Sequence, residues 1–72
     1  MKDLLTRVGD NIRKERIKLG LSQEELASIA DIHRTFLSGV ERGERNISLN
    51  TLAKISAGMK VKMATLLKGA DD

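Results

Sequence analysis

Apolar residues recur along the chain at intervals of three and four, the spacing that places them on one face of an α-helix. No segment alternates between apolar and polar residues as a half-buried strand does. Proline is absent, and glycines stand mostly between the apolar repeats. The pattern predicts an all-α domain of five helices, expected at about residues 3–18, 22–30, 34–42, 49–57 and 62–68.

Start and stop signals support these boundaries. Ser22 followed by Glu25 forms a capping box, in which each side chain accepts a hydrogen bond from the other residue's backbone N–H. Ser48 is expected to cap the fourth helix. Glycine is favoured just after a helix because it adopts the left-handed conformation at little cost. We therefore expect the first, third and fourth helices to end at Gly20, Gly43 and Gly58.

The third predicted helix has two chemically different sides. At about 100° per residue, Leu37 and Val40 point inward, and the opposite arc holds Arg34, Thr35, Ser38, Gly39 and Arg42. Such a short-chained surface suits the DNA major groove, where arginine can donate two hydrogen bonds to guanine and threonine can contact the thymine methyl group. Gly39 has no side chain with which to read a base, so we expect it to allow close backbone approach. The alternative is an ordinary solvated polar face.

The setting of this helix favours the DNA-binding interpretation. A capped helix, a three-residue turn and a second helix with a polar outward side form a helix-turn-helix, here at about residues 22–42. In that arrangement, the N-terminal residues of the second helix contact base edges.

Arg16 interrupts the apolar stripe of the first helix, between Ile12 and Leu19. A buried guanidinium must be paired with an acceptor. Glu41 lies beside the apolar arc of the third helix, so we predict an ion pair between Arg16 and Glu41. The alternative is that the guanidinium of Arg16 extends to water along its aliphatic stem.

Composition and charge narrow the function classes. The chain has 72 residues, enough for one domain, with 40% hydrophobic and 32% charged residues. Its formal charge of +3 and pI near 9.6 favour a polyanionic partner. The absence of cysteine excludes disulfides and thiolate metal sites, and a single histidine excludes a multi-histidine metal site. We expect no catalytic residues, cofactor, small-molecule ligand or membrane span, and a cytoplasmic location, because the start of the chain lacks a signal peptide's apolar core.

The C-terminal part, at about residues 49–68, contains more apolar side chains than the other helices can cover. One recognition helix reads only a few base pairs, so useful specificity requires two of them on a symmetric site. We therefore assign part of this excess to a homodimer interface, formed by Leu52, Ile55, Met59, Val61, Met63 and Leu66. The alternative is that these residues close the monomer's own core.

Two segments carry a resemblance to a known family. "RIKLGLSQEELA" and "IHRTFLSGVERGERNISLNTLAKI" resemble the Cro/CI-type (XRE family) helix-turn-helix regulators, whose fold is lambda-repressor-like, and the resemblance extends from Ile12 to Leu67. The short form without a second domain, and "HRTFLS" with "ERGERNIS" in particular, is similar to the controller proteins of restriction–modification systems.

The resemblance implies a homodimer that activates and represses restriction–modification genes by binding a near-palindromic double-stranded DNA operator. It implies that bases are read by Arg34, Thr35, Ser38, Arg45 and Asn46. It implies that DNA phosphates are held by Gln23, Ser22, Arg42 and Ser48, since helix starts attract anions.

Several alternatives stay open at this point. Dimers could pair into a tetramer on DNA, and Glu24 or Glu25 could contact RNA polymerase. The chain could instead be an antitoxin-type or phage-repressor-type regulator whose main partner is a protein. An enzyme is the weakest alternative, because the residues needed for catalysis are scarce. Adjacent methyltransferase and endonuclease genes would distinguish a controller from an antitoxin, whose neighbour would be a toxin gene.

Overall fold

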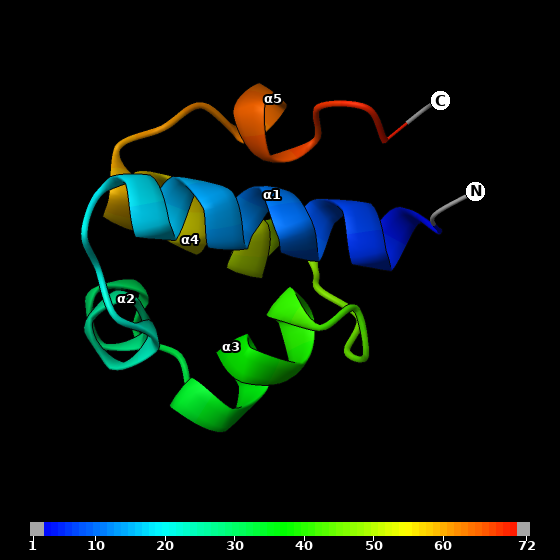
Figure 1. Ribbon diagram of the computed structural model, residues 1–72. Coiled ribbons are helices and arrows are strands. Elements are labelled where there is room, and N and C mark those ends of the chain that lie inside the picture. The colour runs from blue at the N-terminus through cyan, green and yellow to red at the C-terminus, as the bar shows by residue number, and fades with distance from the viewer. Residues whose placement is uncertain (1–2, 71–72) are drawn as a thin grey trace.

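The structure, a computed structural model, describes residues 3–70, and these residues form five α-helices without a β-strand among them. The helices are α1 (Leu4–Lys18), α2 (Gln23–Ala30), α3 (Arg34–Glu41), α4 (Leu49–Met59) and α5 (Met63–Leu66). In Figure 1, α1 crosses the middle of the molecule, with α2 and α3 on one side of it and α5 on the other. The prediction of an all-α, five-helix domain is confirmed. Within residues 3–70, no helix combines the length and apolar character needed to cross a bilayer.

The predicted caps hold the helix ends in place. In the capping box of α2, the hydroxyl of Ser22 accepts from the backbone N–H of Glu25 at 3.0 Å, and the carboxylate of Glu25 accepts from the N–H of Ser22 at 2.8 Å. Ser48 caps α4 in the same way, through a side-chain acceptor. Gly20 and Gly43 have φ angles of +73° and +75°, the left-handed conformation expected just after α1 and α3.

The prediction that Gly58 ends the fourth helix is wrong. Helix α4 continues to Met59, and Lys60 takes the left-handed conformation after it, with φ of 57°. A Cβ atom at Gly58 would lie 3.0 Å from Cγ2 of Ile29 in α2. The glycine therefore allows α2 and α4 to approach closely. Helix α5 is also shorter than expected, with only one turn from Met63 to Leu66.

The core is built from all five helices and contains Val8, Ile12, Leu26, Ala27, Ala30, Leu37, Val40, Leu52, Ile55, Met59 and Leu66. Leu19, which we expected on the apolar stripe of α1, is instead 49% exposed just beyond the end of that helix.

The assignment of a dimer interface is corrected for four residues. Leu52, Ile55, Met59 and Leu66 are each at most 3% exposed within the single chain. Their side chains are not available for a subunit interface, because they project from α4 and α5 into the monomer's own core. The alternative interpretation of the apolar pattern therefore holds for these four residues. Val61 and Met63 are only partly buried against this core.

Helix α1 holds α3 through two contacts. At Gly9, a Cβ atom would overlap the carbonyl oxygens of Val40 and Glu41, so only glycine lets the two helices come this close. The predicted ion pair is present: Nε of Arg16 donates to Oε2 of Glu41 at 2.8 Å, and a second guanidinium nitrogen donates to Oε1 at 3.0 Å. These contacts fix which side of α3 faces outward.

Candidate nucleic-acid interface

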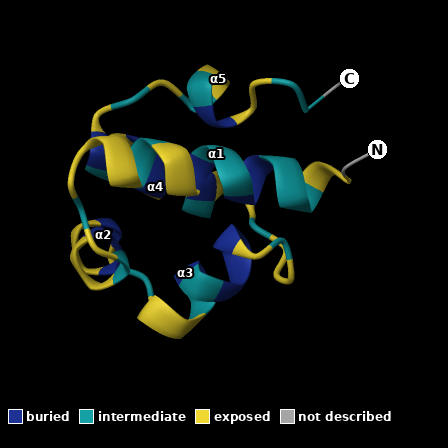
Figure 2. Cartoon of the chain, viewed as in Figure 1, coloured by how far each residue is buried: buried dark blue, intermediate teal, exposed yellow. Residues whose placement is uncertain are grey.

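The outward side of α3 begins at its N-terminal end. Leu37 and Val40 are buried against the rest of the domain, whereas Arg34 and Thr35 are exposed. Figure 2 shows this exposed end of α3 turned away from α1. The helix therefore presents an arginine and a threonine to solvent at the position where a helix-turn-helix protein contacts bases.

Arg34 has an ionic neighbour that the sequence analysis did not predict. Its guanidinium lies 3.5 Å from a carboxylate oxygen of Glu24 in α2, and the two side chains are 61% and 75% exposed. An exposed pair of this kind contributes little to stability, so the arginine can exchange Glu24 for another acceptor. The spacing of residues within one helix could not predict this pair, because it joins α2 to α3 across the turn.

Ser38 and Arg42 lie one helical turn apart and contact each other. The guanidinium of Arg42 donates to the hydroxyl of Ser38, and its Nε donates to a carboxylate oxygen of Glu44 at 3.0 Å. Ser38 is half-buried and Arg42 is exposed. In the free protein, both predicted DNA contacts are therefore already hydrogen-bonded to neighbouring side chains.

The loop after α3 folds back along that helix. The guanidinium carbon of Arg45 lies 5.6 Å from the centroid of the Phe36 ring, within the range of a cation–π contact. The backbone N–H of Glu44 donates to the carbonyl of Gly39 at 2.9 Å. Arg45 and its neighbour Asn46 are both exposed. The loop thus adds an arginine and an asparagine beside the outward side of α3.

Gly39 has a different role from the one expected. It is buried, and a Cβ atom there would lie 2.5 Å from Cγ of Arg45. The space that the missing side chain leaves is filled by the stem of Arg45, so the backbone of Gly39 is covered rather than open to an approaching ligand. Its glycine lets Arg45 lie flat against α3.

The predicted phosphate contacts in α2 and before α4 have structural partners. Nε2 of Gln23 donates to Oε1 of the buried Glu41 at 3.1 Å, and the Ser22 and Ser48 hydroxyls cap their helices. The capping bond also lowers the pKa of Glu25, chiefly because its carboxylate accepts the backbone N–H of Ser22. Backbone N–H groups at the start of α2 remain the feature best suited to an anion.

The helix-turn-helix and the loop after it carry a net negative charge despite their arginines. Residues 22–46 contain three arginines and five acidic residues, a formal charge of −2. Attraction of DNA to this segment therefore depends on the placement of individual arginines and N–H groups rather than on a broad basic surface.

Comparisons with known proteins agree with this arrangement. A family model described as helix-turn-helix matches residues 12–66. The chain is 43% identical over 67 residues to the control protein C.MunI from a Mycoplasma species, covering 92% of this chain and 90% of that protein. It is 45% identical over 60 residues to the control protein C.BamHI from Bacillus amyloliquefaciens, covering 82% and 74%.

Solved structures give the same result. The crystal structure of the restriction-modification controller protein C.AhdI from Aeromonas hydrophila has a TM-score of 0.85 and 37% identity, covering 86% of this chain and 94% of that one. The wild-type restriction-modification controller protein C.Esp1396I has a TM-score of 0.86 and 32% identity, covering 99% and 93%.

Proposed function

Because this chain belongs to the helix-turn-helix family, and within it to the control proteins of restriction–modification systems, we propose that it is a homodimeric controller that activates and represses restriction–modification genes. It is a sequence-specific DNA-binding regulator of transcription, and the proposal includes no enzymatic activity. The proposal includes the dimer, the near-palindromic operator and the identity of the controlled genes. It also includes a location in the cytoplasm, together with the DNA.

The observation that carries this function is the free N-terminal end of α3. Arg34 and Thr35 are exposed and belong to no part of the core, while α1 holds the other side of the helix. Arginine and threonine match the guanine acceptors and the thymine methyl group in the major groove. We assign base reading to these two residues and to Ser38, Arg45 and Asn46. Ser22, Gln23, Arg42 and Ser48 would approach phosphates beside them.

Reading a near-palindrome requires two copies related by a two-fold axis. The two copies of α3 would then lie about 34 Å apart, one turn of duplex. Val61 and Met63 are half-buried, and Leu67 after α5 is 37% exposed, so apolar surface is available beside α5. We assign the dimer contact to this surface in place of the four core residues named above.

The dimer contact can be tested with Leu67→Glu, against Lys54→Glu as a control at an exposed position of α4 outside the assigned contact. A charge at the contact should convert dimer to monomer in sedimentation equilibrium, with the helical circular dichroism unchanged. Lys54→Glu should remain dimeric. A dimer that survives Leu67→Glu would remove α5 from the interface.

The function itself is tested by selecting bound duplexes from a random pool with the wild-type protein, Arg34→Ala and Lys54→Ala. Loss of a bidentate arginine–guanine contact should cost about 1–3 kcal/mol and relax the preference at one position in each half-site. Lys54 is exposed on α4, so Lys54→Ala should select the wild-type sequence. If no sequence is enriched, or if Arg34→Ala selects the same one, the proposed function is wrong.

Two finer contacts belong to the same proposal. Dimers would pair into a tetramer on adjacent half-sites, and RNA polymerase would meet the acidic start of α2 at Glu24. That carboxylate is exposed, whereas the carboxylate of Glu25 is occupied by the capping box. Transcription in vitro with Glu24→Gln should lose activation although operator binding is not weakened.

A further inference from the structure

The positive charge of this chain lies mainly away from the helix-turn-helix. The whole chain has a formal charge of +3, whereas residues 22–46 alone carry −2. The basic excess therefore belongs to the segments before and after the helix-turn-helix, which include α1, α4 and α5. A charge of this sign attracts polyanions, and the DNA-reading side of α3 does not account for it.

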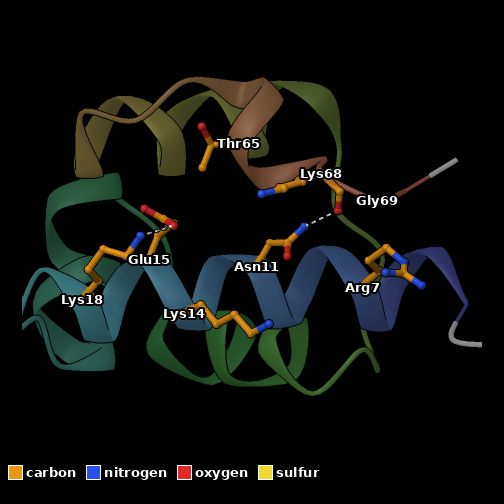
Figure 3. A pocket seen from close by; sticks show the side chains of 8 residues that line it. All are labelled: Arg7, Asn11, Lys14, Glu15, Lys18, Thr65, Lys68 and Gly69. Atoms are coloured by element: carbon orange, nitrogen blue, oxygen red, sulfur yellow. Dashed lines mark hydrogen bonds and ion pairs between the residues drawn. The ribbon is translucent and has the colours of Figure 1, made fainter. Parts of the chain in front are cut away.

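Part of this excess gathers in one groove between α1 and α5. The groove has a volume of about 750 Å³ and is lined by Arg7, Asn11, Lys14, Glu15, Lys18, Thr65, Lys68 and Gly69. Figure 3 shows these side chains around the space between the two helices, with Lys68 extending into it from the α5 side. Four cationic side chains thus face a single acid, Glu15, whose carboxylate lies 3.3 Å from Lys18. We call this site the α1–α5 groove.

The two walls of the groove are held together by Asn11. Its Nδ2 donates to the carbonyl of Leu66 at 3.0 Å and to that of Lys68 at 2.9 Å. These bonds satisfy carbonyls at the end of α5 that have no partner within so short a helix. The groove is therefore a fixed feature, in which α5 is fastened to the middle of α1.

The α1 cations that line the groove form a line rather than a cluster. Arg7, Lys14 and Lys18 stand at i, i+7 and i+11, with Asn11 between them, so all share one side of the helix. At 1.5 Å per residue, the line extends about 16 Å. A single phosphate could meet only one or two of these cations. A nucleic-acid backbone carries a charged phosphate at every nucleotide, so a strand running along the line can place more than one phosphate beside these cations.

We propose that the α1–α5 groove binds the phosphodiester backbone of a second nucleic-acid segment while α3 occupies the operator. Helix α3 lies on the opposite side of α1 from α5 (Figure 1), so the two segments would not compete for the same surface. Exchange of the exposed contact between Lys18 and Glu15 for a phosphate costs little. The inference goes beyond the proposed function, since it concerns another face of the protein and a second nucleic-acid segment.

The test is a capture experiment with the full chain. The selected operator duplex is fixed to a surface and saturated with protein, and a labelled duplex of unrelated sequence is then added. The groove variant is Lys14→Ala/Lys18→Ala/Lys68→Ala, and the matched control is Arg13→Ala/Lys54→Ala/Lys62→Ala, which removes the same charge from exposed positions outside the groove. Wild type and control should capture the labelled duplex, and the groove variant should capture at least tenfold less.

The salt dependence gives an independent reading of the same contact. Each lost phosphate contact lowers the slope of log K against log salt by about 0.9, so three lysines should lower it by up to about 2.7. A labelled single strand is tested in parallel, to show whether the groove binds the backbone of duplex or of single-stranded nucleic acid. Capture of either one supports backbone binding in the groove. Failure of wild type to capture either, or equal losses in the groove and control variants, would overturn the proposal.

Two further measurements separate backbone binding in the groove from binding of a small anion and from operator reading by α3. If inorganic triphosphate displaces the second segment at a concentration equal to that of the segment's own phosphates, the site takes a small anion and the backbone proposal is wrong. The groove variant should select the same operator as wild type and bind it with an affinity within about twofold of the wild-type value. The three groove lysines make no phosphate contact with the operator in this proposal, so their loss should hardly change operator binding. If wild type selects no operator, the proposed function fails, and a comparison of the groove and control variants in direct binding of the unrelated duplex still tests the groove.

Discussion

Replacing Glu41 by leucine while Arg16 stays in place should destabilise this protein more than replacing both residues. The carboxylate of Glu41 accepts from Arg16 at 2.8 and 3.0 Å and from Gln23 at 3.1 Å, and its side chain is only 2% exposed. In Glu41→Leu, the guanidinium of Arg16, whose side chain is 12% exposed, keeps its hydrogen bond to the carbonyl of Leu21, at 2.8 Å, and loses its contacts with the carboxylate. A charge is then left largely desolvated without its counterion.

The size of the effect follows from that burial. Removing one member of a buried pair costs about 3–5 kcal/mol. A chain of 72 residues has a free energy of unfolding of roughly 4–11 kcal/mol, at 0.05–0.15 kcal/mol per residue. Glu41→Leu should therefore remove about half of the stability. The double variant Arg16→Met/Glu41→Leu should lie within about 1 kcal/mol of wild type, because an apolar pair replaces the ion pair and Gln23 and Leu21 are only half-buried.

The assay is urea denaturation followed by far-UV circular dichroism, since the chain has no tryptophan or tyrosine to report unfolding by fluorescence. All variants are compared at one protein concentration, because self-association changes apparent stability. The four proteins form a double-mutant cycle, in which we expect a coupling energy of at least about 2 kcal/mol. A double variant as unstable as Glu41→Leu, or a single variant that loses less than about 1 kcal/mol, would refute the reasoning.

Three other substitutions test separate parts of the structure. Gly9→Ala should lower the free energy of unfolding, measured by urea denaturation, by about 1–3 kcal/mol, because the added methyl group meets the backbone of α3. An unchanged free energy of unfolding would contradict the close contact of α1 and α3. Glu25→Gln should flatten the loss of stability in acid, measured as Tm against pH: the folded pKa of Glu25 lies below its ordinary 4.5, so its contribution is present above that value and lost as the pH falls through the lowered one. An unchanged acid profile would mean that other carboxylates dominate. Glu24→Gln should strengthen operator binding by up to about fivefold in a fluorescence anisotropy titration, since an exposed pair is worth up to about 1 kcal/mol and Arg34 no longer has to leave it; weaker binding would show that Glu24 instead positions Arg34.

Local signals predicted most of the fold. Capping residues and left-handed glycines act within one turn, so Ser22, Glu25, Gly20 and Gly43 could be interpreted without knowing what lies nearby. The partner of Arg16 was also predictable, because a cation inside an apolar stripe needs an acceptor and few acids face the core. These inferences required only the period of a helix and the cost of desolvating a charge.

The errors arose where the answer depends on which helices meet. Periodicity predicts that Leu52, Ile55 and Leu66 are buried. The sequence pattern is the same, however, whether a side chain is covered by its own chain or by a second copy. Gly58 has the composition of a helix stop, and only the approach of Ile29 reveals it as a packing residue. The contact between Glu24 and Arg34 likewise depends on the angle between α2 and α3. Such facts come from tertiary geometry.

The covered glycine of α3 links two positions in any change of operator preference. While Arg45 lies against α3, a side chain at residue 39 has no room. A lineage that acquired serine or alanine there first would displace Arg45, and with it the base contact that we propose for this arginine, before gaining a new one. Shortening residue 45 first opens the space. The order of mutation is therefore constrained, and these two sites should show strong epistasis in a combinatorial library that varies both.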